Sequence, residues 1–143
     1  MERLNINLIT KNREEIISLL DDVIKEKSIA EEKYQQLCDY ISSKNTYIYG
    51  HIKDEKVVSL IWFYKRLFAG QNRIHISFIS VDENHRKKGY AKQLIDFCME
   101  TAKENDIELV DLNVDSDNVI ARKLYEKLCF QEEKVLLSRK VRE

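Results

Sequence analysis

The chain has 143 residues, of which 43% are hydrophobic and 34% are charged, a composition typical of one folded globular domain and not of a disordered chain. Its 24 basic and 25 acidic residues leave a net charge of -1, which excludes a global attraction to nucleic acid, so any basic function must be local. No run approaches the ~18 apolar residues of a membrane span, and the first residues lack an apolar signal core. We therefore expect a cytoplasmic protein without membrane association.

The cysteine pattern argues against a disulfide framework. Cys38, Cys98 and Cys129 are odd in number and far apart, and no C-x-x-C pair is present. Neither a set of disulfides nor a metal site is predicted, and buried small hydrophobic side chains are the simpler interpretation.

The first part of the chain predicts one strand and two helices. Apolar residues alternate with polar ones over residues 4–8, which favours a short strand. Asn12 followed by Glu15 resembles a capping box before an apolar helical stripe. Ser28 followed by Glu31 resembles a second box, so a second helix is predicted from there.

The rest of the chain predicts further strands and two more helices. Tyr47–Ile52 and Val57–Tyr64 are β-branched and aromatic runs around a polar turn, which predicts a hairpin, and Ile74–Val81 predicts a third strand. Helical spacing begins at Ala91 and ends near Asn105. A short apolar strand covered on both faces is expected over 109–114, then a helix capped at Asp117 or Asn118 and strand-like pieces over 130–141. This order predicts one mixed α/β sheet with helices on both faces.

The stretch HRKKGYAKQL, residues 85–94, enters the helix that begins near Ala91. The first N–H groups of a helix have no internal partner, so with the helix dipole they favour an anion, and Gly89 allows close approach of a ligand. Arg86, Lys87 and their neighbours add positive charge. A solvated basic helix end, a nucleic-acid patch and a phosphate cradle all fit this pattern alone. Neither a Walker loop nor a Rossmann G-x-G-x-x-G is present.

Two blocks narrow these alternatives. Arg86-x-x-Gly89-x-Ala91 resembles the Q/R-x-x-G-x-G/A acetyl-CoA signature of the GNAT N-acetyltransferase superfamily. The block NVIARKLYEKLCF, residues 118–130, resembles the N-x-x-A-x-x-L-Y-x-x-x-G-F pattern of the same family. The two blocks stand in the order and at the spacing that the family uses.

The resemblance implies a fold, a cofactor and a site. It implies a single domain over residues 1–143, with a mostly antiparallel, twisted sheet of six to seven strands and about four helices on its two faces. Acetyl-CoA is the implied cosubstrate, with its pyrophosphate on the backbone N–H groups of residues 86–92, and no metal is implied. The implied cofactor-binding residues are Ile79, Ser80, Val81, Arg86, Lys87, Lys88, Gly89, Tyr90, Ala91, Lys92, Asn118 and Tyr125.

The resemblance also implies catalytic roles. Tyr125 matches the general acid that protonates the departing thiolate, although an amphipathic core tyrosine remains the alternative. His75 stands where histone-type members have a glutamate, so we expect it to take the amine proton, unless it is a solvent-edge histidine. Asp111 and Asp115 are reserve candidates. Cys129 replaces the glycine before Phe130, a turn position that often requires positive φ, so we expect the exit from the last helix to be either strained or rebuilt.

The function that these residues predict is transfer of an acetyl group to a primary amine in a ternary complex. The acceptor stays open among small amines, amino sugars and peptide or protein amines. The alternative is a domain that binds acetyl-CoA without chemistry. No nucleic-acid partner is expected, and a homodimer is compatible with the resemblance.

Overall fold

Two long antiparallel strands, β5 (Ser59–Phe68) and β6 (Gln71–Val81), form the centre of the main sheet in the computed structural model. The strand order is β1-β2-β5-β6-β7, and only β7 runs parallel to its neighbour. A small antiparallel sheet pairs β3 with β4. The predicted mixed, mostly antiparallel α/β fold is confirmed, with seven strands among the described residues, five of them in the main sheet.

The structure describes residues 1–142, which divide into two units: Met1–Asn113 and the part from Val114 onward. A single domain over the whole chain stays a prediction. The remaining elements are β1 (Glu2–Arg3), α1 (Ile6–Lys11), α2 (Arg13–Ile24), α3 (Lys27–Tyr40), β2 (Thr46–Gly50), β3 (Ile52–Lys53), β4 (Lys56–Val57), the 3₁₀-helix η1 (Glu83–His85), α4 (Tyr90–Glu104), β7 (Leu109–Leu112) and α5 (Val119–Lys127).

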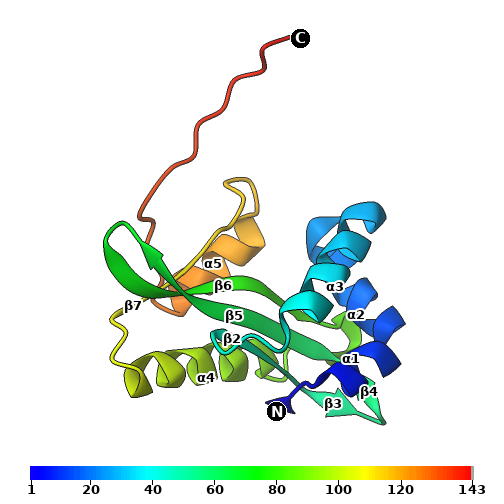
Figure 1. Cartoon of the computed structure of the whole chain (residues 1–143). Coiled ribbons are helices and arrows are strands. Elements are labelled where there is room, and N and C mark those ends of the chain that lie inside the picture. Colours follow the sequence, from blue (N-terminus) through cyan, green and yellow to red (C-terminus); the bar gives the residue numbers. More distant parts are fainter. Residues whose placement is uncertain (143) are drawn as a thin grey trace. The chain divides into compact units, whose positions relative to one another are not determined.

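Alternation along β5 explains why helices of the first unit cover both faces of the sheet. Leu60 and Trp62 point into a core that also contains the apolar stripes of α2 and α3. Phe63 points to the opposite face, where its ring lies 6.0 Å from that of Phe97 on α4. Because successive strand residues face opposite sides, one apolar run serves both layers. Figure 1 shows α4 along one face and α2 and α3 on the other.

The strand predicted over residues 4–8 is wrong. The strand β1 ends at Arg3, and Asn5 begins α1 by accepting a hydrogen bond from the N–H of Leu8 at 2.9 Å. Leu4 and Ile9 are both fully buried. Alternating apolar residues over so short a segment also fit one turn of helix, and the cap at Asn5 decides between the two.

The two predicted helices exist, but their capping boxes do not. Asn12 is the N-cap of α2, yet its side chain accepts from the N–H of Val57 at 3.1 Å and donates to the carbonyl of Leu8 at 3.0 Å. It ties the helix to β4 instead of capping it. The second helix, α3, begins at Lys27, so Ser28 lies inside its first turn.

A β-bulge interrupts the pairing of β5 with β6. Trp62 pairs with Phe78 and Phe63 pairs with Ile76, so Ser77 is an extra residue on β6. The strand β7 pairs with β6 only as far as Ile76, so the edge of β6 from residue 77 to residue 81 is left without a strand partner on that side in the described structure.

The second unit consists of α5 and an exposed extended tail. Asn118 caps α5, as predicted, by accepting from the N–H of Ala121 at 3.1 Å. The strand pieces predicted over 130–141 are wrong, because residues 130–142 contain no strand. No helix within residues 1–142 is long and apolar enough to cross a bilayer.

Candidate active site

The start of α4 leaves backbone donors without acceptors. The N–H of Gln93 donates to the carbonyl of Gly89 at 3.0 Å and makes the first bond of the helix. Among residues 1–142, no acceptor faces the N–H groups of Tyr90, Ala91 and Lys92. Gly89 has φ of 82°, and a Cβ there would point into open space. A phosphate fits such a helix start.

The basic side chains around this turn are unequal. The Arg86 guanidinium bonds the carboxylate of Asp22 and donates from Nε to the carbonyl of Val81 at 3.1 Å. Lys92 pairs with a carboxylate of its own helix, one turn later. Lys87 and Lys88 are exposed and have no ion pair with the described residues. The two lysines therefore supply the uncompensated charge, while Arg86 fixes the loop.

The free edge of β6 lies beside this helix start in the sequence and supplies further backbone groups. On one side, Ile79 and Val81 pair with Ile61 and Ser59 of β5. On the other side, the pairing with β7 ends at Ile76, so neither residue has a strand partner there in the described structure. Ser80 is buried. The unpaired N–H and carbonyl groups of an open strand edge can bind an extended ligand such as a pantetheine arm.

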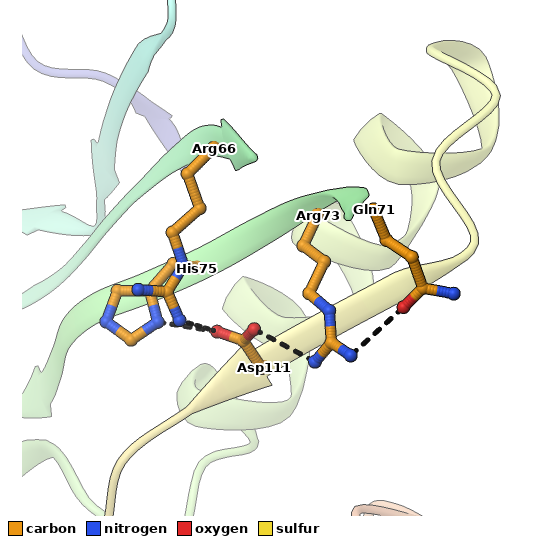
Figure 2. Close-up of polar contacts among 5 residues, drawn as sticks. All are labelled: Arg66, Gln71, Arg73, His75 and Asp111. Atoms are coloured by element: carbon orange, nitrogen blue, oxygen red, sulfur yellow. Dashed lines mark hydrogen bonds and ion pairs between the residues drawn. The ribbon is translucent and has the colours of Figure 1, made fainter. Parts of the chain in front are cut away.

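His75, which is buried, and Asp111, which is partly buried, form a pair across the parallel strands β6 and β7. The two residues are direct partners in the strand register, and His75 Nδ1 lies 2.6 Å from Asp111 Oδ1 (Figure 2). Because an ionised carboxylate only accepts, Nδ1 carries a proton, and in the neutral imidazole Nε2 keeps a lone pair. No partner for Nε2 exists among residues 1–142. This arrangement suits a group that accepts a proton.

Two arginines hold the carboxylate in place. Arg66 Nη2 lies 3.1 Å from Asp111 Oδ1, and Arg73 Nη1 lies 3.3 Å from Oδ2. Gln71 accepts from Arg73 at 3.1 Å (Figure 2). Burial alone raises the pKa of Asp111, but the hydrogen bond from His75 and the charge of Arg66 outweigh it and lower that pKa. Asp111 therefore stays ionised and keeps His75 oriented.

A buried histidine that the sequence did not single out supports the start of α4. His51 Nε2 lies 2.7 Å from Gln93 Oε1, and its ring stacks on Tyr90 at 4.0 Å. His51 Nδ1 lies 2.6 Å from Ser59 Oγ. Because an amide oxygen only accepts, Nε2 carries the proton and the Ser59 hydroxyl donates to Nδ1. Burial lowers the pKa of His51, so the ring stays neutral.

A second missed residue is Lys33 on α3. Its Nζ lies 3.0 Å from Ser77 Oγ, at the bulge of β6, and 4.9 Å from the ring centroid of Trp62. The only signal in the sequence is a lysine inside an amphipathic helix, and the contact spans 44 positions. Nothing in a helical pattern identifies such a contact.

The second unit carries the remaining expected residues on α5. Tyr125 is partly buried, and burial raises the pKa of its phenol, so it is protonated at neutral pH. Its ring meets Phe130 edge-on at 5.7 Å. Cys129 has φ of 68°, which confirms the left-handed turn expected there with a non-glycine residue.

Comparison with known proteins gives the family. A family model described as Acetyltransferase (GNAT) family matches residues 14–130. An uncharacterized N-acetyltransferase, YycN, from Bacillus subtilis (strain 168) is 32% identical over 90 residues, and the match covers 63% of this chain and 58% of that relative. The chain therefore belongs to the GNAT acetyltransferase family, whose members are acyltransferases.

Solved structures share the fold. An aminoglycoside acetyltransferase, meta-AAC0020, from an uncultured soil metagenomic sample has a TM-score of 0.78 at 21% identity, covering 99% of this chain and 95% of its own. A ribosomal-protein-alanine N-acetyltransferase from Brucella melitensis biovar Abortus 2308 has a TM-score of 0.71 at 21% identity, with 97% of both chains covered.

Proposed function

We propose that this protein transfers the acetyl group of acetyl-CoA to a primary amine, directly and in a ternary complex. The observation that carries the proposal is the start of α4, where the N–H groups of Tyr90, Ala91 and Lys92 have no acceptor among residues 1–142. Members of the GNAT family generally use acetyl-CoA, and these donors fit its pyrophosphate.

The proposed binding site for the cofactor also includes the end of β6. Ile79, Ser80 and Val81 would hold the pantetheine arm through the backbone edge that β7 leaves unpaired. Lys87 and Lys88 would add charge for the phosphates, with Arg86 fixing the loop. When bound, acetyl-CoA supplies an activated acetyl thioester, and a donor aimed at its developing oxyanion contributes roughly 10²- to 10³-fold in rate.

His75 would act as the general base. An alkylammonium is not a nucleophile until it loses a proton, and the lone pair on His75 Nε2 can take that proton directly or through water. Asp111 holds the imidazole in the tautomer that leaves Nε2 free, from 2.6 Å away. The matched strand register of His75 and Asp111 supports this role.

Tyr125 would act as the general acid, and Asn118 would cap its helix and contact the cofactor arm. Support comes from the match of residues 118–130 to the family pattern and from a phenol that burial keeps protonated. A thiolate leaving group has a pKa near ~8.5, so a phenol is a suitable proton donor for it at neutral pH.

Calorimetry with acetyl-CoA tests whether the start of α4 is a cradle for phosphate, that is, whether its free N–H groups bind the pyrophosphate. Gly89→Glu places bulk and negative charge at the helix start, so we expect its affinity for acetyl-CoA to fall by at least about tenfold, or about 1.4 kcal/mol. Gly70→Glu is the matched control, because Gly70 also has positive φ and open space around it but lies in the β5–β6 turn. Equal affinities for the two variants would refute the cradle.

A thiol-release assay over a broad panel of amines tests the chemistry. We expect release of coenzyme A with at least one amine and none without an acceptor. If the protein binds acetyl-CoA but releases no coenzyme A with any amine, it is a non-catalytic acetyl-CoA-binding domain and not an enzyme.

A further inference from the structure

Lys33 is a partly buried cation without a counter-ion. Its Nζ donates to Ser77 Oγ at 3.0 Å and lies over the ring of Trp62. No carboxylate of residues 1–142 pairs with it. Burial lowers the pKa of the Lys33 ammonium. An ammonium has three donors, so this side chain has N–H groups left for an oxygen ligand.

Trp62, whose ring lies beneath the Lys33 ammonium, has a donor of its own that is unpaired within residues 1–142. The residue is 4% exposed, and its indole Nε1 has no hydrogen-bond partner in the described structure. Buried polar groups are nearly always hydrogen-bonded, and an indole N–H can only donate. Lys33 therefore presents free donors and positive charge beside a polar group that has no partner of its own among the described residues, which fits an oxygen-rich ligand carrying negative charge.

Trp62 lies on the same face of the sheet as His75, and α3, which carries Lys33, packs against that face. Tyr64 is the register partner of His75 and stands two residues after Trp62 on β5, so the three side chains share one face. Ser77 is the first residue of β6 beyond the pairing with β7. An acceptor whose amine meets His75 would thus extend another group toward Lys33.

We propose that the acceptor carries a carboxylate in addition to its amine, and that Lys33 binds this carboxylate beside the ring of Trp62. This inference rests on the proposed function, because it places the amine at His75. The Lys33 ammonium has N–H groups left for a carboxylate oxygen and carries the opposite charge. A polycationic amine is disfavoured at the same place, because Lys33 repels it.

The test uses amines that differ only in the charged group. A series of ω-amino acids from glycine to 6-aminohexanoate is compared with the matching amides in the thiol-release assay. At the best length, we expect kcat/KM for the acid to exceed that for its amide by at least about tenfold. Lys33→Met should remove most of this difference by raising KM for the acid. Lys27→Met, an exposed lysine of the same helix, should leave it unchanged.

Trp62 provides a readout that needs no turnover. It is the single tryptophan of the chain, so its emission reports binding at this place. We expect saturable changes with the favoured ω-amino acid, none with its amide, and none in Lys33→Met. If no amine is turned over, the proposed function is wrong. The fluorescence titration still decides whether the carboxylate binds at Lys33.

Three outcomes would overturn the inference. The first is equal kcat/KM for acid and amide at every length. The second is a Lys33→Met variant that loses activity toward both alike, which would give Lys33 a general structural role. The third is a larger fluorescence response to the matching aminoalkylphosphonate, which would replace carboxylate by phosphate.

Discussion

At the scale of single residues, the proposed mechanism assigns deprotonation of the acceptor amine to His75, held by Asp111. We expect His75→Gln to lower kcat by about 10²- to 10⁴-fold, because general-base catalysis contributes about that much. Steady-state kinetics at saturating acetyl-CoA measures the effect.

The matched control is His85→Gln. His85 also bonds a carboxylate, Asp82, at 2.9 Å, but it lies on η1 outside the proposed base position. Its kcat should stay within about twofold of the native value. Equal losses in the two variants would remove His75 from the role of base.

Cys129 is a residue whose strain is visible in the backbone. It occupies the C′ position of a Schellman motif, in which Phe130 N–H bonds the carbonyl of Tyr125 at 2.9 Å and Cys129 N–H bonds that of Glu126 at 3.0 Å. A left-handed conformation costs an L-residue roughly 1–2 kcal/mol, and glycine avoids this cost. Part of the advantage is offset because glycine loses more conformational entropy on folding.

We therefore expect Cys129→Gly to raise the free energy of unfolding by about 0.5–1 kcal/mol. Urea denaturation followed by circular dichroism measures it. Cys129→Ala keeps the positive φ and should give no gain. A gain of equal size in Cys129→Ala would show that the thiol, and not the backbone, is the cause.

At the scale of elements, His51 couples β5 to the first turn of α4. His51 is neutral between Ser59 and Gln93, and its pKa lies below the ordinary value of 6.5 mainly because the ring is buried. The hydrogen bond to Gln93 raises this pKa, and the positive charges of the N-terminus and Lys53 lower it further. Below pH 6.5 the unfolded chain takes up the proton first, so this histidine lowers stability as pH falls from 6.5 toward its folded-state pKa.

We expect His51→Gln to flatten the fall of unfolding free energy over this pH range, and to weaken acetyl-CoA binding by about 1 kcal/mol through the lost bond to Gln93. Urea denaturation at a series of pH values and calorimetry measure the two effects. His85→Gln should retain the native slope. An unchanged slope in His51→Gln would assign the pH dependence to another group.

Long amphipathic elements were predictable from the sequence and short ones were not. The helix from Ala91 to Asn105 and the strand from Ile74 carry many residues on one period, so their type is unambiguous. Residues 4–8 hold too few apolar positions to separate a strand from a helical turn. The apolar tail residues 135–137 are exposed, which pattern alone does not reveal.

The candidate site was predictable only where a local motif marks it. Gly89 and Ala91 stand in such a motif, and His75 is found by counting back from Val81, at the end of the strand that precedes the motif. Asp111 becomes its partner through the register of two parallel strands, and Lys33 through the packing of α3 on the bulge of β6. Both contacts depend on tertiary structure.

At the scale of the whole molecule, the balanced charge argues against nucleic-acid binding. Of the basic side chains at the start of α4, Arg86 and Lys92 already pair with carboxylates. With at most about four phosphate contacts, we expect binding to a short DNA duplex to be weaker than about 10⁻⁴ M at physiological salt. Fluorescence anisotropy measures this affinity; micromolar affinity that falls steeply with salt would contradict the expectation.

A homodimer stays a prediction, and light scattering would measure the mass of the particle in solution.

The bulge at Ser77 has a consequence for how related chains can change length. Since Ser77 is an extra residue, removing it would leave Ile76 and Phe78 opposite Phe63 and Trp62, as they are now. The sheet would lose no register and no buried side chain would change face. What would disappear is the hydroxyl that holds Lys33. A one-residue deletion at this point would therefore alter the proposed acceptor side of the protein while sparing its architecture.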